Sequence, residues 1–403
     1  MRKIFALLVI ILCLNTTAQR AFPLQAPDER VHDWVWNVLA VPPSGGWDKE
    51  PGKSIKTALS WCEREISESS SGIGGHDVKF TLLPVPESSD SPASDVVFEF
   101  GPYTAAVMSF TLSPEEDRIL VARLAGRNIP LMLAGGESVL IDIGGRPVSN
   151  IFALDMYRDY RCQAFTEYAK RIYSREKRIA LAASRFTVNQ EREAKICYSL
   201  LDSEGFMPMP YWTDASAKDS YYMMSEEIES FEGEQAGVVI SFMGSMGARE
   251  IWRNFMRIRT SWRLWNVAEP DEIYLSCRGM IFADQNILLP TQGGFIETRR
   301  MLWRTRAMQV NDSVAAGKAI ALYEWFRRAV ELMPQPVDAM PRAQLLRNLE
   351  RVQSIPFGNQ NISISPSLHR PSSRNVFIVE IRDREYSALD TVRVNALAYV
   401  PAY

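Results

Sequence analysis

The sequence predicts an α/β protein built from two doubly wound, Rossmann-like lobes. Short continuous apolar segments, typical of buried parallel strands, alternate with amphipathic helical segments along most of the chain. The alternation comes in two blocks, and 403 residues exceed what one hydrophobic core usually organises. A hydrophobic content of 46% is enough to fill two cores, so we expect one core in each block.

Residues 1–18 carry the pattern of an export signal. Two basic residues precede the apolar run Ile4–Leu14, and small residues stand before a cleavage point after Ala18. The run is shorter than the ~20 residues that span a bilayer, so we expect cleavage rather than a membrane anchor. Cys13 is a candidate for lipidation, but Leu12 stands where a lipobox has a small residue. We therefore expect a mature chain in the periplasm.

The first block contains apolar runs separated by turns and helical segments. Trp34–Val41 is typical of an opening buried strand, and the loop Pro42–Gly46 joins it to an amphipathic helix. Ser113 begins a later helix, because Pro114 fits the first helical position and Glu116 the third. The predicted strands are 34–41, 78–83, 96–100, 105–110 and 129–134, and the predicted helices are 52–68 and 114–126.

The second block repeats the alternation and ends in two strands. Gly205 fits the C-terminal stop of one helix. The loop Met243–Gly247, rich in Gly, Ser and Met, leads from a strand into a helix that begins at Ala248. The predicted helices are 159–174, 190–203, 225–231, 248 onwards, 314–332 and 343–352, and the predicted strands are 178–183, 207–212, 237–242, 272–277, 375–382 and 391–400.

Composition and charge argue against several classes of function. A net charge of −3 provides no field that attracts nucleic acid. Five arginines between Arg249 and Arg263 cluster with Trp252 and Trp262, but their spacing fits the exposed face of an amphipathic helix better than a nucleic-acid patch. With three His residues and neither CxxC nor HExxH, the chain has no pattern for a metal site.

No sequence pattern of a catalytic or cofactor site is present. Gly72–Gly75 departs from GxGxxG because Asp77 replaces the last glycine, and it precedes a strand instead of following one. Gly244–Gly247 lacks the spacing of a GxSxG nucleophile elbow, and no P-loop lysine occurs. We expect a binding protein without a cofactor, and not an enzyme.

Four cysteines remain after the predicted cleavage. Their even number permits disulfides in an oxidising compartment, whereas their wide spacing within apolar stretches suits buried thiols equally well. The sequence leaves both alternatives open. The four residues are Cys62, Cys162, Cys197 and Cys277.

Doubly wound sheets offer a ligand crevice at the carboxyl ends of their strands, where loops lead into helices. Helix N-termini there present free N–H groups and a positive dipole end, which can hold a carboxylate. The best candidate is Thr111–Ser113, although Ser113 could equally serve only as a helix cap. Trp47 follows the first strand and forms either a wall of the crevice or part of the core. Equivalent strand ends are 135–138, 184–188 and 243–245.

Three segments share a pattern with one known family. Ser70–Lys79 matches a "GGI-x-G-x-x-V" passage, Arg127–Met132 matches a "gvPli" strand, and Phe357–Ile381 matches a closing "f-x-G-x-i-x-f … v-x-i-v-x-v" passage. Together with the order of elements from Trp34 to Tyr386, they resemble the type I periplasmic binding proteins, specifically the branched-chain amino-acid receptors of ABC importers.

This resemblance implies the periplasmic binding protein-like I fold, in which two lobes are joined by a three-crossover hinge and close on a ligand. The crossovers should fall near Ala153–Tyr157, Arg278–Asp284 and Phe357–Ile362. The first lobe should then hold residues 30–153 and 283–357, and the second lobe residues 154–282 and 358–403.

The sequence departs from the family pattern at several ligand positions. The family's amino-acid receptors place an acid after the strand that corresponds to Glu272–Cys277, whereas this chain has Arg278. An Arg fork suits a carboxylate better than an ammonium group, so we expect a small carboxylate-bearing ligand. Thr111, Ser113 and Arg278 are the expected anion partners; Trp47, Phe186 and Met243 are the expected apolar walls; Ser138 and Ser245 are further strand-end candidates.

The resemblance favours a periplasmic solute-binding protein that hands an amino acid or other small carboxylate to an ABC permease in the inner membrane. The alternative is a ligand-sensing or interaction protein on the same fold, acting on a membrane sensor or a cell-wall synthase. A third reading is a secreted enzyme with an unrecognised site. The fold does not decide among these classes of function.

Overall fold

The computed structural model describes most of the chain between Trp34 and Asn395. The predicted export signal 1–18, the predicted helix 225–231 and nearly all of the predicted strand 96–100 lie outside the described residues. The described residues are 34–69, 71–84, 100–111, 114–135, 142–143, 146–156, 160–174, 177–184, 188–213, 236–258, 262–268, 270, 272–284, 307–335, 337, 340–357 and 360–395.

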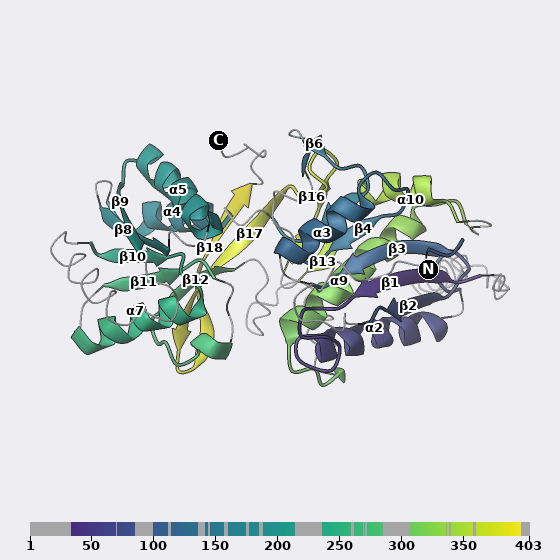
Figure 1. The fold of residues 1–403 in the computed structure, drawn as a ribbon, viewed down its shortest axis with the longest axis horizontal. Coiled ribbons are helices and arrows are strands. Elements are labelled where there is room, and N and C mark those ends of the chain that lie inside the picture. Colours follow the sequence, from purple (N-terminus) through teal and green to yellow (C-terminus); the bar gives the residue numbers. More distant parts are fainter. Residues whose placement is uncertain are drawn as a thin grey trace, which may run out of the picture.

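The first lobe is built on a five-stranded parallel sheet in the order β2-β1-β3-β4-β7 (Figure 1). Its strands are β1 (Trp36–Val41), β2 (Val78–Leu82), β3 (Thr104–Ser109), β4 (Leu131–Leu133) and β7 (Ile151–Ala153). Its helices are α2 (Gly52–Ser67), α3 (Pro114–Leu124), α9 (Ser313–Glu331) and α10 (Arg342–Leu349). Three short hairpins complete the lobe and its junction: β5 (Asp142–Ile143) with β6 (Arg146–Pro147), β13 (Ile355–Phe357) with β14 (Gln360–Ile362), and β15 (Ile364–Ser365) with β16 (Arg370–Pro371).

Both faces of this sheet are covered because successive strand residues point to opposite sides. Val38 and Ala40 pack in a large cluster with α2 and α9, whereas Leu39 and Val41 pack with α3. Burying each such Val or Leu side chain stabilises the fold by roughly 1.5–3 kcal/mol. The continuous apolar pattern of the strand thus follows from burial on both faces.

The second lobe is built on a seven-stranded sheet in the order β18-β17-β12-β11-β10-β8-β9 (Figure 1). The strands from β8 to β12 run parallel, and the long hairpin β17-β18 joins antiparallel to β12. The strands are β8 (Arg178–Ser184), β9 (Met207–Thr213), β10 (Val238–Ser241), β11 (Arg263–Asn266), β12 (Ile281–Asp284), β17 (Ser373–Arg382) and β18 (Glu385–Asn395).

Helices cover both faces of the second sheet as well. Helix α4 (Tyr160–Ile172) and helix α5 (Val188–Ser203) pack on one face, and helix α7 (Ser245–Ile258) packs on the other. Gly205 follows α5 with φ of +84°, so the predicted glycine stop is confirmed. In the described part of the chain, no helix combines the length and the apolar composition that a membrane crossing requires.

The predicted fold class, two doubly wound lobes, is confirmed. Two assignments in the second lobe were wrong. The predicted strand 272–277 is a short 3-10 helix (Glu272–Tyr274) followed by a turn, and the sheet instead contains β11 and β12. Because α7 ends at Ile258, Arg263 lies on β11 and not on the helix face that we predicted for all five arginines.

The chain passes between the lobes three times. Leu154 packs in the first lobe and Met156 in the second, so the first crossing is at Asp155. The second and third crossings come later than expected, because β12 lies inside the second sheet and Ile364 still packs in the first lobe. The second crossing therefore follows β12, and the third lies between Ile364 and β17.

The four cysteines among the described residues are buried thiols, and no disulfide joins them. Cys62 lies on α2 in the first lobe, and the other three lie in the second lobe. Of the two alternatives that the sequence left open, the structure therefore has the thiol form.

Candidate functional site

The parallel strands of both lobes end at the junction between them. In the first lobe, β7 leads directly into the first crossing. In the second lobe, β17 begins at the junction and runs away from it. Strand β12 is antiparallel to β17, so β12 and the strands parallel to it end toward the first lobe. Figure 1 shows the lobes side by side with β17 and β18 extending from the junction. The carboxyl edges of both sheets therefore face each other across the junction, and the region between them, where doubly wound sheets bind ligands, is called the crevice below.

The carboxyl edge of the first lobe contains a buried hydrogen-bond network around Asp117 of α3. The hydroxyl of Thr111 donates to Asp117 Oδ1 at 2.6 Å, and the hydroxyl of Ser109 donates to the same oxygen at 2.9 Å. The two hydroxyl oxygens lie 3.2 Å apart. The Thr111 proton is therefore engaged by a carboxylate of the protein itself, which makes Thr111 a poor donor to a ligand carboxylate.

Trp47 lies in the loop after β1, where the sequence allowed either a crevice wall or core packing. The residue is buried, its indole N–H donates to the carbonyl of Leu83 at 2.8 Å, and its ring meets Phe110 edge-on at 6.5 Å. The structure thus has Trp47 in the core of the first lobe, and its remaining surface lines a groove along α2.

The carboxyl edge of the second lobe is a row of polar strand ends. Ser184, Ser241, Asn266 and Asp284 are the last residues of β8, β10, β11 and β12, and all four are buried. Ser241 is level with Asn266 in the sheet register. Ser184 lies two residues beyond the register partner of Ser241, and Asp284 lies two residues beyond the partner of Asn266. The outer two side chains therefore lie closer to the crevice.

Local turns hold the inner polar residues of this edge in place. The Met243 N–H donates to the Ser241 hydroxyl at 3.3 Å, and the Ala268 N–H donates to Asn266 Oδ1 at 3.1 Å. Met243 itself is buried and packs in the cluster under α7, so little of it reaches the crevice. Asn266 and Ser241 thus act mainly as turn formers at their strand ends.

A buried charge cluster lies at the hinge between the two edges. Asp155, in the first crossing, accepts from Lys318 Nζ of α9 at 3.1 Å and lies 3.9 Å from Nη1 of Arg374 at the start of β17. Arg374 also donates to the carbonyl of Leu154 at 3.0 Å, and its guanidinium lies 4.5 Å over the ring of Phe357. Complete burial lowers the pKa of Arg374 to about 10, although Asp155 opposes the shift. The cluster joins the first lobe, the first crossing and β17.

The structure separates the predicted site residues. Arg278 is exposed and lies in the turn before β12, where its carbonyl accepts from the indole of Trp252. Its place at the amino end of β12 corrects the expectation that it follows a strand into the crevice; the residue that ends β12 is Asp284. Ser245 begins α7 at the carboxyl edge of β10. Ser113, Ser138 and Phe186 lie outside the described residues.

Sequence reasoning missed the two carboxylates at the crevice edges. Asp117 lies inside a helix whose start was predicted correctly. Its position six residues after Thr111, in the first turns of that helix, was the signal that could have placed its carboxylate near the strand-end hydroxyls. Asp284 ends a four-residue strand that was expected to be a crossover. Its position depends on β12 pairing with β17, almost 100 residues away in sequence. Local periodicity does not report such a pairing.

Two doubly wound lobes joined by three crossings, with both sets of strand ends facing each other, form the fold of the type I periplasmic binding proteins. One solved structure with this fold is the leucine-binding protein LivK of Thermotoga maritima. It is 9% identical, with a TM-score of 0.68, and the match covers 89% of this chain and 99% of that one.

Two further solved structures contain ligands. A solute-binding protein of an ABC transporter from R. palustris, in complex with benzoate, is 12% identical with a TM-score of 0.66, covering 91% of this chain and 99% of that one. A branched-chain amino-acid ABC transporter protein from Thermus thermophilus, with bound valine, is 13% identical with a TM-score of 0.63, covering 88% and 94%. No protein-family model and no curated protein matches the sequence.

Proposed function

We propose that the chain is an exported solute-binding protein that captures a small amino acid between its lobes and delivers it to an ABC permease in the inner membrane. The observation that carries the proposal is that the polar carboxyl edges of the two sheets face each other at the junction between the lobes. Solute-binding proteins of ABC transporters with bound benzoate and valine share this fold. The predicted export signal and a periplasmic location belong to the same proposal.

The charges at the crevice edges favour an amino acid over a simple carboxylate. Asp117 and Asp284 contribute negative potential at the first and second edges, which attracts an ammonium group. The first turn of α7 presents backbone N–H groups and a positive dipole end at the second edge, which suits the ligand carboxylate. The expected role of Arg278 as an anion partner is withdrawn, because Arg278 lies at the other edge of the sheet.

A thermal-shift screen of the mature chain against amino acids and against aromatic and aliphatic acids tests this proposal. We expect at least one amino acid to raise the melting temperature in a concentration-dependent way, because a ligand that binds only the folded state stabilises it. Asp284→Asn should remove the shift, whereas Glu385→Gln, an exposed acid at the tip of the β17-β18 hairpin, should keep it.

Uptake by cells separates transport from sensing. Deleting the protein should lower uptake of the ligand that the screen identifies. Unchanged uptake together with ligand binding would favour the sensing alternative on the same fold. A stabilising series of simple acids, with no amino acid among the hits, would contradict the proposed ligand class.

A further inference from the structure

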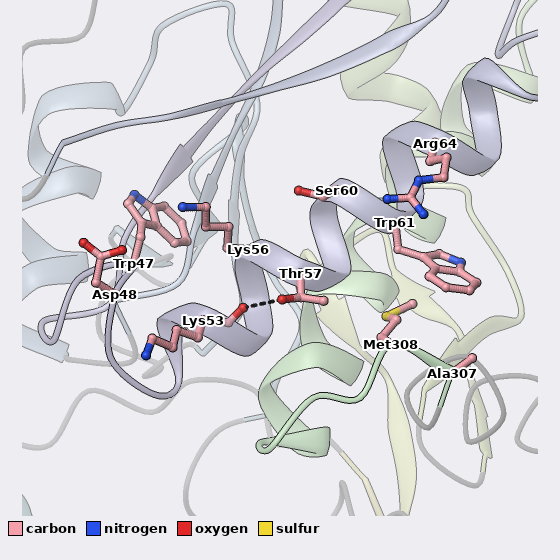
Figure 2. A pocket seen from close by; sticks show the side chains of 10 residues that line it. All are labelled: Trp47, Asp48, Lys53, Lys56, Thr57, Ser60, Trp61, Arg64, Ala307 and Met308. Carbon is pink, nitrogen blue, oxygen red and sulfur yellow. Dashed lines mark hydrogen bonds between the residues drawn. The ribbon is translucent and has the colours of Figure 1, made fainter.

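A groove runs along the outer face of α2, from the loop after β1, which contains Trp47, to Arg64 in the last turn of the helix. Its volume is about 560 Å³, within the range of small-molecule sites. It is bounded by the loop after β1, by one face of α2 and by the two residues at 307–308 that precede α9. Its lining residues are Trp47, Asp48, Lys53, Lys56, Thr57, Ser60, Trp61, Arg64, Ala307 and Met308 (Figure 2).

One face of α2 carries three exposed cations over the groove. No ion pair within the described part of the chain involves Lys53, Lys56 or Arg64. Among the described residues that line the groove, Asp48 is the one acid. Lys56 and Arg64 are eight residues apart, or about 12 Å along the helix. Ser60 lies midway between them on the same face. Like charges along one helix face repel each other, so an anion placed between them is favoured.

The floor of the groove is apolar and fixed in place. Trp61 is half-buried against the first-lobe core, and Met308 is buried in the same core. The adjoining loop is held because Glu50 accepts from the Ser54 hydroxyl at 2.7 Å and from the Asn311 amide at 3.3 Å. A groove that is formed before binding avoids the entropic cost of ordering its walls.

The aromatic and cationic groups occur together at both ends of the groove. Figure 2 shows Arg64 at the Trp61 end and Lys56 extending toward the Trp47 end, with Ser60 between them. A planar apolar group gains contact area on an indole face, and an anionic group gains charge-assisted hydrogen bonds from Lys and Arg. A single molecule that carries both a planar apolar group and an anionic group would make both kinds of contact.

We propose that this groove is a second ligand site, which takes a small organic anion with a planar apolar part. The apolar part lies on Trp61 and Met308, and a carboxylate, sulfonate or phosphate group lies over Ser60 between Lys56 and Arg64. The site is on the outer surface of the first lobe and does not depend on the crevice function.

Isothermal titration of the mature protein with naphthalene-2-sulfonate tests the proposal. We expect one binding event, weakened at least about tenfold, or 1.4 kcal/mol, by the double variant Lys56→Gln/Arg64→Gln. Trp61→Leu should weaken it as well, and the neutral analogue 2-naphthalenemethanol should bind at least about tenfold more weakly than the sulfonate. Lys79→Gln, which removes an exposed cation from β2, is the matched control and should leave the affinity unchanged.

The crevice variant Asp284→Asn separates the two sites. Binding of the sulfonate that survives Asp284→Asn and is lost in the α2 double variant supports the groove. Binding that is lost in Asp284→Asn, binding that the α2 double variant leaves intact, or no binding at all overturns it. Both α2 substitutions are at exposed positions, and an unchanged melting temperature confirms that the variant is folded. A failed amino-acid screen leaves this result unaffected.

Discussion

The two lobes share a parallel-strand plan but differ at the edge that faces the crevice. In the first lobe, two strand-end hydroxyls are tied to the carboxylate of Asp117. In the second lobe, four neighbouring strands each end on a polar residue, and the outer two, Ser184 and Asp284, lie nearest the opening. We infer that the first edge is a rigid platform and that the second edge supplies most of the contacts that select the ligand.

The largest expected effect tests the charge cluster that joins the lobes. Asp155→Ala removes the carboxylate that accepts from the buried Lys318 and lies beside the buried Arg374, and removing one partner from a buried pair costs about 3–5 kcal/mol. The solvent-accessible pair Arg171–Asp390 within the second lobe is the control, because removing Asp390 should cost at most about 1 kcal/mol. Urea denaturation of both variants measures the difference. Equal small losses would show that the hinge cluster adds nothing to stability.

The next effect compares the two crevice edges directly. Thr111→Val removes a donor to the buried carboxylate of Asp117 and should cost about 1.5–3 kcal/mol. Ser241→Ala removes a neutral acceptor from the Met243 N–H, and because this bond is long, at 3.3 Å, it should cost only about 1 kcal/mol. Denaturant midpoints report both values. A larger loss for Ser241→Ala would reverse the assignment of the rigid edge.

Two buried tryptophans, one in the core of each lobe, allow the stability cost of the same substitution to be compared between the lobes. The Trp325 indole N–H donates to the carbonyl of Leu349 at 2.9 Å, whereas that of Trp265 is buried without a hydrogen-bond partner among the described residues. Trp325→Phe should therefore cost about 1–3 kcal/mol more than Trp265→Phe, because it leaves a carbonyl unpaired. Thermal unfolding of the two variants provides the comparison. Equal losses would mean that ring volume alone sets both costs.

The smallest effect concerns thiol reactivity. Burial raises the pKa of the Cys277 thiol, against smaller opposing contributions from Ser276 and the nearby arginines, so less thiolate is present at a given pH. For the mature chain, which lacks Cys13, we expect a thiol reagent at pH 8 to react with fewer than one cysteine in the folded protein and with four after denaturation. A count of two or fewer in denaturant would show a disulfide and would contradict the thiol form.

Sequence reasoning worked best where one segment carried a complete local signal. The continuous apolar run of β1 and the capped start of α3 predicted those elements within two residues. It failed at β11, a four-residue strand that begins with Arg263 and Leu264 and follows closely behind α7. Its strand conformation comes from pairing with β10 and β12, which the local sequence does not encode.

The same reason limited the prediction of the site. Thr111 was placed at the correct strand end, but its proton goes to Asp117, and only the structure shows which acceptor a hydroxyl chooses. Arg278 was assigned to the crevice because the neighbouring segment 272–277 was taken as a strand. Because of this one wrong strand, sequence reasoning placed the cation of Arg278 at the strand end where the structure has the carboxylate of Asp284.

The central claim is that a small solute closes the two edges on each other, and a spin-label distance across the crevice tests it most directly. Asp48→Cys and Met246→Cys place exposed thiols just beyond the strand ends of the two lobes, and the buried native thiols should not compete for the label. With an excess mixture of amino acids, the account predicts a shorter distance, and Asp284→Asn should abolish the change. An unchanged distance in the unaltered crevice, with the same mixture, would contradict capture between the lobes.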